Sequence, residues 1–159
     1  MFLKKQRAVV VPFEDEVVVE LRKMEQEAHE LIGAGTNSSS SEIVNLIYVY
    51  VEKLLLSEKS ADEISSISIL LAAAWGFAVC REYGWEWRYL EVKGKFARSY
   101  YILSPDHWYC CSPFYFLNKI LEGKNPGFDG KNDNTILLLF NMIKTLGEKI
   151  PNEKYTTIS

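Results

Sequence analysis

The sequence of 159 residues contains few of the features that usually identify a chemical function. It has two histidines and three cysteines, and the metal-ligand spacings Cys-x-x-Cys and His-x-x-x-His are absent. A glycine-rich phosphate loop with its lysine and the Gly-x-Ser-x-Gly motif of serine hydrolases are absent as well. These absences argue against a zinc site, a P-loop nucleotide site and an α/β-hydrolase, and we expect no cofactor.

An excess of positive charge is also missing. The chain has 18 basic and 21 acidic residues, a net charge of −3, which argues against a general nucleic-acid binder. Its 48% hydrophobic and 25% charged residues are typical of a globular protein and exclude a disordered chain. A chain of this size buries about 69% of its surface on folding, so it needs neither disulfides nor a structural metal.

The cysteines and the short apolar runs indicate the compartment. Cys80, Cys110 and Cys111 are an odd set with one adjacent pair, which is typical of free thiols in a reducing cytosol. The apolar run at 8–11 is too short for a signal peptide. The uncharged run at 64–80 contains serines and a glycine, so we interpret it as a buried helix and not as a membrane span. We therefore expect a cytoplasmic protein.

Apolar residues at helical spacing predict three helices in the first half of the chain, at about 14–32, 43–54 and 61–83. Ser39 with Glu42, and Ser60 with Glu63, can form capping boxes before the second and third helices. The third helix is apolar almost all round, which is typical of a central helix covered on several sides. The acidic residues of the first helix are interpreted as a solvated face.

After Gly84 the period of the pattern changes from 3.6 to 2. Alternation over 85–90 and 96–103, around the turn Lys93-Gly94-Lys95, predicts a β-hairpin, and 108–111 predicts a short third strand. The segment 8–11 is compatible with an edge strand.

Two more helices are predicted after the strands. Ser112-Pro113 is a good helix start, and 135–146 has the pattern of a last helix. The order is three helices, an antiparallel meander of about three strands and two helices, which indicates the α+β class. We predict a single domain over 1–159, with an extended segment at 1–13 and a loose tail at 148–159.

The segment from His107 to Cys111 is the strongest candidate for catalysis. His107 with Cys110 or Cys111 would make a Cys–His nucleophile pair, as in a small hydrolase or transferase. On a regular strand, however, His107 and Cys111 are about 13 Å apart, and Cys110 faces the other side. Either pair therefore needs a bend, and a turn histidine beside buried thiols is the simpler interpretation.

Aromatic and basic side chains alternate along the hairpin. One hairpin face has to cover the central helix, so we expect half of the aromatic residues to belong to the core. Exposed Trp, Tyr and Arg dominate binding hot spots. We therefore take Trp87, Tyr89, Arg98 and Tyr100 as the candidate binding patch. The acidic chain favours a protein or peptide partner over nucleic acid.

Three motifs, Ala73-Ala74-Trp75-Gly76-Phe77, Gly84-Trp85-Glu86-Trp87 and Ser112-Pro113-Phe114, lie within residues 73–123, about a third of the chain. This stretch resembles a group of poorly characterised bacterial α+β domains, some of which occur beside toxin systems as candidate immunity proteins. The resemblance implies an α+β fold and transfers no functional residue.

These observations lead to two functional hypotheses. The first is a non-catalytic interaction domain of a bacterial cytosolic protein, immunity-like, that binds a partner protein through the aromatic and basic hairpin. Residues 1–63 carry 7 basic and 12 acidic side chains, which would suit a basic partner. The alternative is the Cys/His-dependent hydrolase or transferase.

Overall fold

The computed structural model describes residues 4–92, 98–122, 134–146 and 154–157, and within them it has five helices and five strands. The helices are α1 (Asp15–Ile32), α2 (Ser40–Leu55), α3 (Ala61–Tyr83), α4 (Pro113–Leu121) and α5 (Asn134–Ile143). The strands are β1 (Lys4–Val11), β2 (Glu86–Val92), β3 (Arg98–Leu103), β4 (Tyr109–Cys111) and β5 (Lys154–Thr157). The predicted α+β fold is confirmed, with three helices before the meander and two after it. The predicted turn at 93–95 lies outside the described residues.

Local signals set the boundaries of the first helices. Ser39 and Ser60 each accept a hydrogen bond from a backbone N–H three residues later, at 3.2 Å, so both predicted N-caps are present. α3 ends at Gly84, whose φ is +71° and whose N–H donates to the carbonyl of Cys80 at 3.0 Å. Residues with a side chain rarely adopt this left-handed backbone conformation. This explains why a glycine lies between α3 and the strand that follows it.

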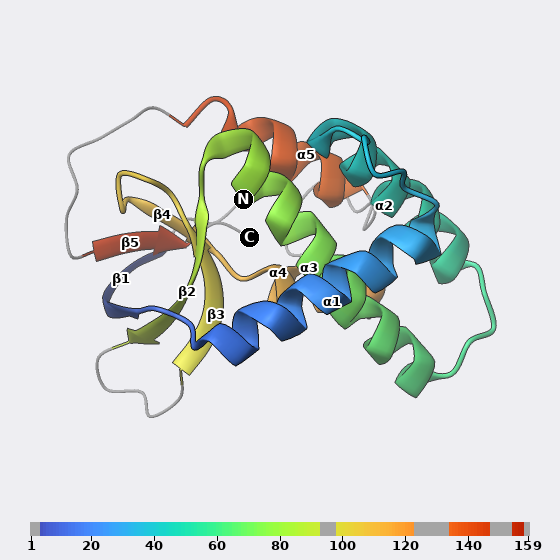
Figure 1. Ribbon diagram of the computed structural model, residues 1–159, viewed down its shortest axis with the longest axis horizontal. Coiled ribbons are helices and arrows are strands. Elements are labelled where there is room, and N and C mark those ends of the chain that lie inside the picture. Colours follow the sequence, from blue (N-terminus) through green and yellow to red (C-terminus); the bar gives the residue numbers. More distant parts are fainter. Residues whose placement is uncertain (1–3, 93–97, 123–133, 147–153, 158–159) are drawn as a thin grey trace.

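The strands form a small closed barrel at one end of the molecule (Figure 1). Strands β1, β2, β3 and β4 pair antiparallel in that order, so the predicted meander of β2, β3 and β4 gains β1 as a fourth strand. β5 then pairs antiparallel with β1 and parallel with β4. The loose tail expected at 148–159 is therefore wrong for Lys154–Thr157, and the rest of that segment lies outside the described residues. Without β5, the outer edges of β1 and β4 would have unpaired backbone groups, and the tyrosine and threonines of β5 favour strand conformation.

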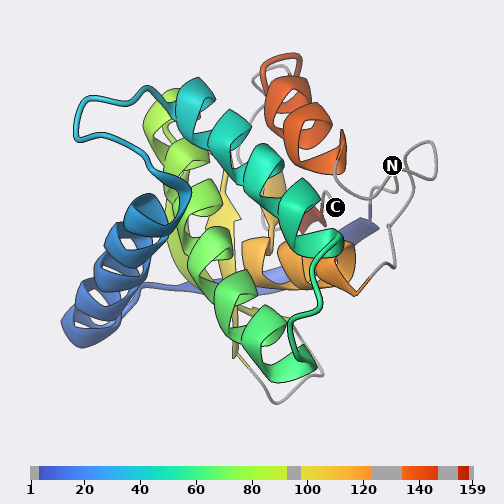
Figure 2. The same cartoon turned by 90° about the vertical axis from the view of Figure 1, so that its right-hand side faces the viewer.

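Helix α3 occupies the centre of the fold. It packs against α1, α2 and α4, and Figure 2 shows α1 and α2 on different sides of it. By length and composition α3 could cross a membrane, but 56% of its most apolar 18-residue window is buried inside the structure. Trp75 and Tyr83 of α3 donate hydrogen bonds to the carbonyls of Ile136 (3.3 Å) and Phe140 (2.8 Å), which attach α5 to the same helix.

The strands of the meander separate two cores. Trp87, Ile102 and Cys111 face the helices and belong to the main core, whereas Leu90, Leu103 and Cys110 form a second, smaller cluster. This alternation is the period of 2 that the hairpin sequence shows.

The Trp87 ring packs directly on α3 at Gly76. A Cβ atom at Gly76 would overlap Cζ2 of the indole and lie 3.1 Å from Cγ of Pro113. The small residue in the middle of α3 thus allows the sheet to approach the helix.

Candidate functional site

Aromatic rings from three segments of the chain meet where the hairpin approaches α1. The ring of Phe13 has its centroid 4.4 Å from that of Tyr89 and 5.3 Å from that of Tyr100. Phe114 of α4 lies 5.7 Å from Tyr100 and 5.8 Å from Trp87. Three of the four residues of the predicted binding patch are therefore brought into one aromatic cluster.

The exposure of the four patch residues differs from the expectation. Trp87 and Tyr89 are each only 7% exposed, because Trp87 packs on α3 at Gly76 and Phe13 covers the ring of Tyr89. Tyr100 is 39% exposed, and Arg98 is exposed as well. Of the four residues, only Tyr100 and Arg98 are therefore open to solvent, and the ring of Tyr89 packs against both of them.

A hydrogen bond joins Tyr89 of this aromatic cluster to Glu14, the residue before α1. The hydroxyl of Tyr89 donates to Oε2 of Glu14 at 2.8 Å, and this bond, with Arg98 nearby, holds the pKa of the Glu14 carboxyl below its usual value. Burial and the same hydrogen bond raise the pKa of Tyr89. Arg98 lies 5.5 Å above the Tyr89 ring and donates to Glu91 at 2.6 Å, so its guanidinium is held at the rim.

A hollow of about 660 Å³, which we call the α1–β3 groove, opens beside Tyr100. Its apolar side chains come from α1, α3, β3 and α4, and they are Val17, Leu21, Met24, Ile69, Tyr100 and Phe114. Glu16 and Glu20, four residues apart on α1, add two exposed carboxylates to its wall. The groove combines an apolar floor with an acidic side, and a volume of this size is typical of binding sites.

Sequence reasoning missed most of the groove. The predicted binding patch includes Tyr100 but not Phe114, and the interpretation of the acidic residues of α1 as a solvated face leaves out the contribution of this helix. The available signal was the helical spacing of Val17 and Met24, which places both next to Glu16 and Glu20 on the same side of the helix. An amphipathic helix with acidic residues beside its apolar stripe often forms one wall of such a groove.

The histidine and the cysteines of the predicted catalytic pair differ in their exposure to solvent. His107 is exposed, with a φ of +59°, in the turn between β3 and β4. Cys110 and Cys111 are 1% and 0% exposed, and burial raises the pKa of the Cys111 thiol well above its ordinary value. A nucleophilic cysteine needs a reachable thiolate, so this geometry favours the structural interpretation of both thiols.

We expect the native thiols to react slowly with 5,5′-dithiobis(2-nitrobenzoic acid). Burial also raises the pKa of Cys80, to about 12. Labelling at pH 8 should therefore be on the order of 100-fold slower in the folded protein than in urea, because few thiolates form and fewer are reachable. Absorbance at 412 nm measures both rates. One equivalent that reacts within seconds in the folded state would instead support an activated cysteine.

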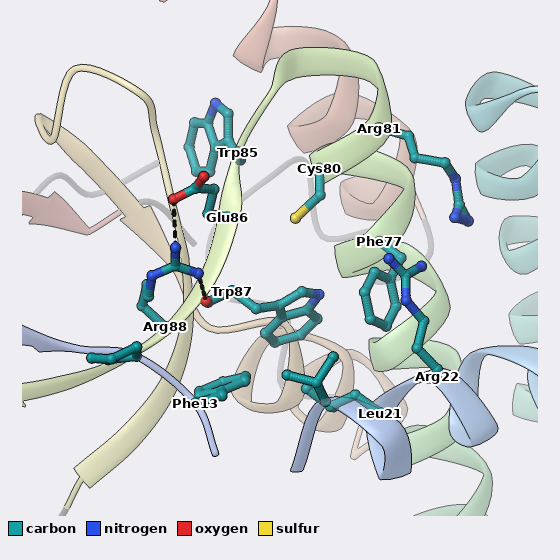
Figure 3. Close-up of a pocket in the computed structure, with 12 residues that line it drawn as sticks. Phe13, Leu21, Arg22, Phe77, Cys80, Arg81, Trp85, Glu86, Trp87 and Arg88 are labelled. Carbon is teal, nitrogen blue, oxygen red and sulfur yellow. Dashed lines mark hydrogen bonds and ion pairs between the residues drawn. The ribbon is translucent and has the colours of Figure 1, made fainter. Parts of the chain in front are cut away.

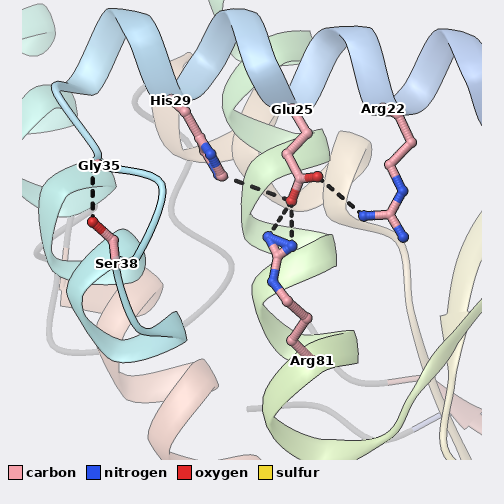
Figure 4. A network of polar contacts seen from close by, with 6 residues as sticks. All are labelled: Arg22, Glu25, His29, Gly35, Ser38 and Arg81. Carbon is pink, nitrogen blue, oxygen red and sulfur yellow. Dashed lines mark hydrogen bonds and ion pairs between the residues drawn. The ribbon is translucent and has the colours of Figure 1, made fainter.

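A buried carboxylate joins α1 to α3 (Figure 4). Glu25 is 7% exposed and accepts hydrogen bonds from both terminal nitrogens of Arg81, with Nη1 at 2.7 Å, and from Nη1 of Arg22 at 3.1 Å. His29 lies 3.8 Å from the same carboxylate, and burial lowers its pKa. The expectation that this whole acidic face is solvated is wrong at Glu25, because Arg81 reaches it from α3.

Comparison with known proteins adds no identity. No family model matches the chain, and neither a curated protein nor a solved structure shows significant similarity to it. Among the residues that the structure describes, no three His, Cys, Asp or Glu side chains are arranged to hold a metal ion.

Proposed function

We propose that this protein is a non-catalytic, immunity-like interaction domain, and that a partner protein places an apolar side chain into the α1–β3 groove. The observation that carries the proposal is the exposure of Tyr100 and Ile69, 39% and 42%, at a hollow that already has an apolar floor. Large apolar side chains that remain exposed together at a hollow are typical of interaction sites.

The charges at the groove indicate the chemistry of the partner. Glu16 and Glu20 lie near the start of α1, and Asp15 adds one more acidic residue to its first turn. Lys23 offsets Glu20 at 3.0 Å, but the ion pair is exposed and weak. A lysine or arginine beside the inserted side chain would meet this acidic wall, so the partner is expected to be basic around its apolar anchor.

The side chain of Tyr100 at the groove is already held in place by contacts within the protein. Tyr100 contacts the rings of Phe13 and Tyr89 below it, and Phe114 beside it, so its side chain loses little freedom when it is covered. A rigid aromatic floor favours affinity because the entropy of ordering has already been lost during folding.

A selected peptide tests the groove directly. From a phage-displayed library of 16-residue peptides we expect binders with Leu or Phe next to Lys or Arg. Their affinity for Tyr100→Ala should be at least about tenfold weaker, since a central aromatic residue contributes more than 1 kcal/mol to an interface. Tyr115→Ala is the matched control, because Tyr115 is 56% exposed on α4 and does not line the groove. Isothermal titration calorimetry measures the affinities.

Two results would contradict the proposed groove. One is a selected peptide set that is acidic. The other is equal binding to the Tyr100→Ala and wild-type proteins. The immunity-like role is tested by co-expression with the product of a neighbouring toxin-like gene. The wild-type protein and Tyr115→Ala should both restore growth, whereas Tyr100→Ala should not.

A further inference from the structure

A second pocket lies on the other side of the first turns of α1, and its charge is opposite to that of the groove. This α1–β2 pocket has a volume of about 510 Å³ and is formed by α1, α3, β2 and the segment before α1. Its aromatic walls come from Phe13, Phe77, Trp85 and Trp87, and Figure 3 shows the Trp87 indole at its centre. The volume lies within the range of small-molecule sites.

Three arginines and one glutamate line the α1–β2 pocket. Figure 3 shows Arg88 on one side of the Trp87 ring and Arg22 on the other, beside Phe77. Arg22 lies 4.0 Å above the Phe77 ring, and Arg88 donates to the carbonyl of Trp87 at 2.6 Å. Nη2 of Arg88 donates a hydrogen bond to Oε2 of Glu86 at 2.9 Å. A guanidinium has five donors, so both arginines keep donors for a ligand.

Counterions nearby reduce but do not cancel this positive charge. Glu25 lies behind the pocket and binds Arg22 and the third arginine, Arg81. With Glu25 and Glu86 counted against the three arginines, the net formal charge around the pocket is 3 − 2 = +1. A monovalent anion would neutralise the site, whereas a cation would be repelled.

One buried polar atom at the pocket has no acceptor. The side chain of Trp87 is more than nine-tenths buried, and solvent does not reach its indole Nε1–H. Within the described part of the chain, this N–H donates no hydrogen bond. An unpaired buried donor is unfavourable, so an oxygen that reached this N–H would be favoured. A ligand has to displace a side chain of the pocket wall to place its oxygen there.

We propose that the α1–β2 pocket binds a compact aromatic carboxylate. Its ring would pack among Phe13, Phe77 and Trp87, and its carboxylate would accept hydrogen bonds from Arg22 or Arg88 and from the Trp87 indole. Guanidinium groups match a carboxylate with two parallel donors, which makes this anion a better fit than a spherical one. The proposal does not rest on the proposed function, because the α1–β3 groove lies on the other side of α1.

The test is a titration of the ¹⁵N-labelled protein with phenylacetate, followed by the indole N–H signal of Trp87, which Trp87→Phe identifies. We expect a saturable shift at millimolar phenylacetate and a clearly smaller effect with the neutral phenylacetamide. Either Arg22→Gln or Arg88→Gln should weaken binding about tenfold, as expected when a charged hydrogen bond is lost, and the variant that does so identifies the arginine that binds the carboxylate. Lys23→Gln is the matched control, because it removes the same charge next to Arg22 but outside the pocket.

A second probe distinguishes the source of the carboxylate. N-acetylphenylalanine presents the ring and acid as a peptide C-terminus does, whereas phenylacetate is a free small acid. Tighter binding of either one supports the site and identifies its natural class of ligand. The proposal is overturned if no saturable shift occurs, if phenylacetamide shifts the signal equally, or if neither arginine variant weakens binding more than Lys23→Gln does.

Discussion

Replacement of Gly76 by alanine is expected to lower the free energy of unfolding by about 2–3 kcal/mol, although alanine is the better helix former. The new methyl group would overlap the Trp87 ring, which Phe13, Phe77 and Phe114 hold on its other sides. Because these rings contact the indole, the overlap is relieved only if the indole disrupts its aromatic contacts or if α3 and β2 separate. For a chain of this length the change corresponds to a fall in Tm of about 5–10 °C, which differential scanning calorimetry measures.

Two controls separate this clash from a general effect of glycine replacement. Gly35→Ala adds a methyl group whose nearest neighbour is 3.7 Å away, so its effect should stay within about 1 kcal/mol and can be stabilising. In a Trp87→Leu background, Gly76→Ala should cost less than in the wild-type protein, because the overlapping ring atoms are gone. An equal cost in both backgrounds would show that the indole is not the cause.

Replacement of Arg81 by methionine is expected to destabilise the protein by about 2 kcal/mol. It removes the main partner of Glu25 and leaves a buried carboxylate with the more exposed Arg22. Removal of one member of a buried ion pair costs about 3–5 kcal/mol. We lower this figure because the Arg81 side chain is 42% exposed and water screens part of the interaction. Urea unfolding followed by tryptophan fluorescence measures the loss.

The double variant Glu25→Leu with Arg81→Met provides the decisive comparison. Its cost should be at least about 1 kcal/mol smaller than the sum of the two single costs, because the buried charge disappears together with its partner. Lys23→Met, which breaks an exposed pair with Glu20, should change stability by less than about 1 kcal/mol. Strict additivity of the Glu25 and Arg81 variants would contradict a coupled pair.

The sequence-based prediction succeeded where the signals are local. The start of α3 depends on Ser60 and its end on Gly84, and both signals lie within a few residues of the boundary that they set. The alternation after Gly84 depends on the period of the strand alone. Such features need no knowledge of what packs against the element, which is why the order of helices and strands could be derived.

The candidate site depends on contacts between distant segments, and these could not be derived. Phe13 covers Tyr89 from 76 positions earlier in the chain, which decides that Tyr100 and not Tyr89 is exposed. Arg81 binds Glu25 from 56 positions later in the chain, so a carboxylate that the sequence pattern assigns to a solvated face is buried. A pattern of apolar and charged residues specifies which face of an element is buried, but it does not specify the partner.

The closure of the barrel by β5 has a consequence for synthesis. Lys4 pairs with Thr157, so a ribosome must translate nearly the whole sequence before the last register can form. Until then a nascent chain presents β1 and β4 with open hydrogen-bonding groups, and pairing across so many positions is slow. A premature stop before residue 154 would make that condition permanent, and such fragments should be targets for chaperones and strand-to-strand aggregation.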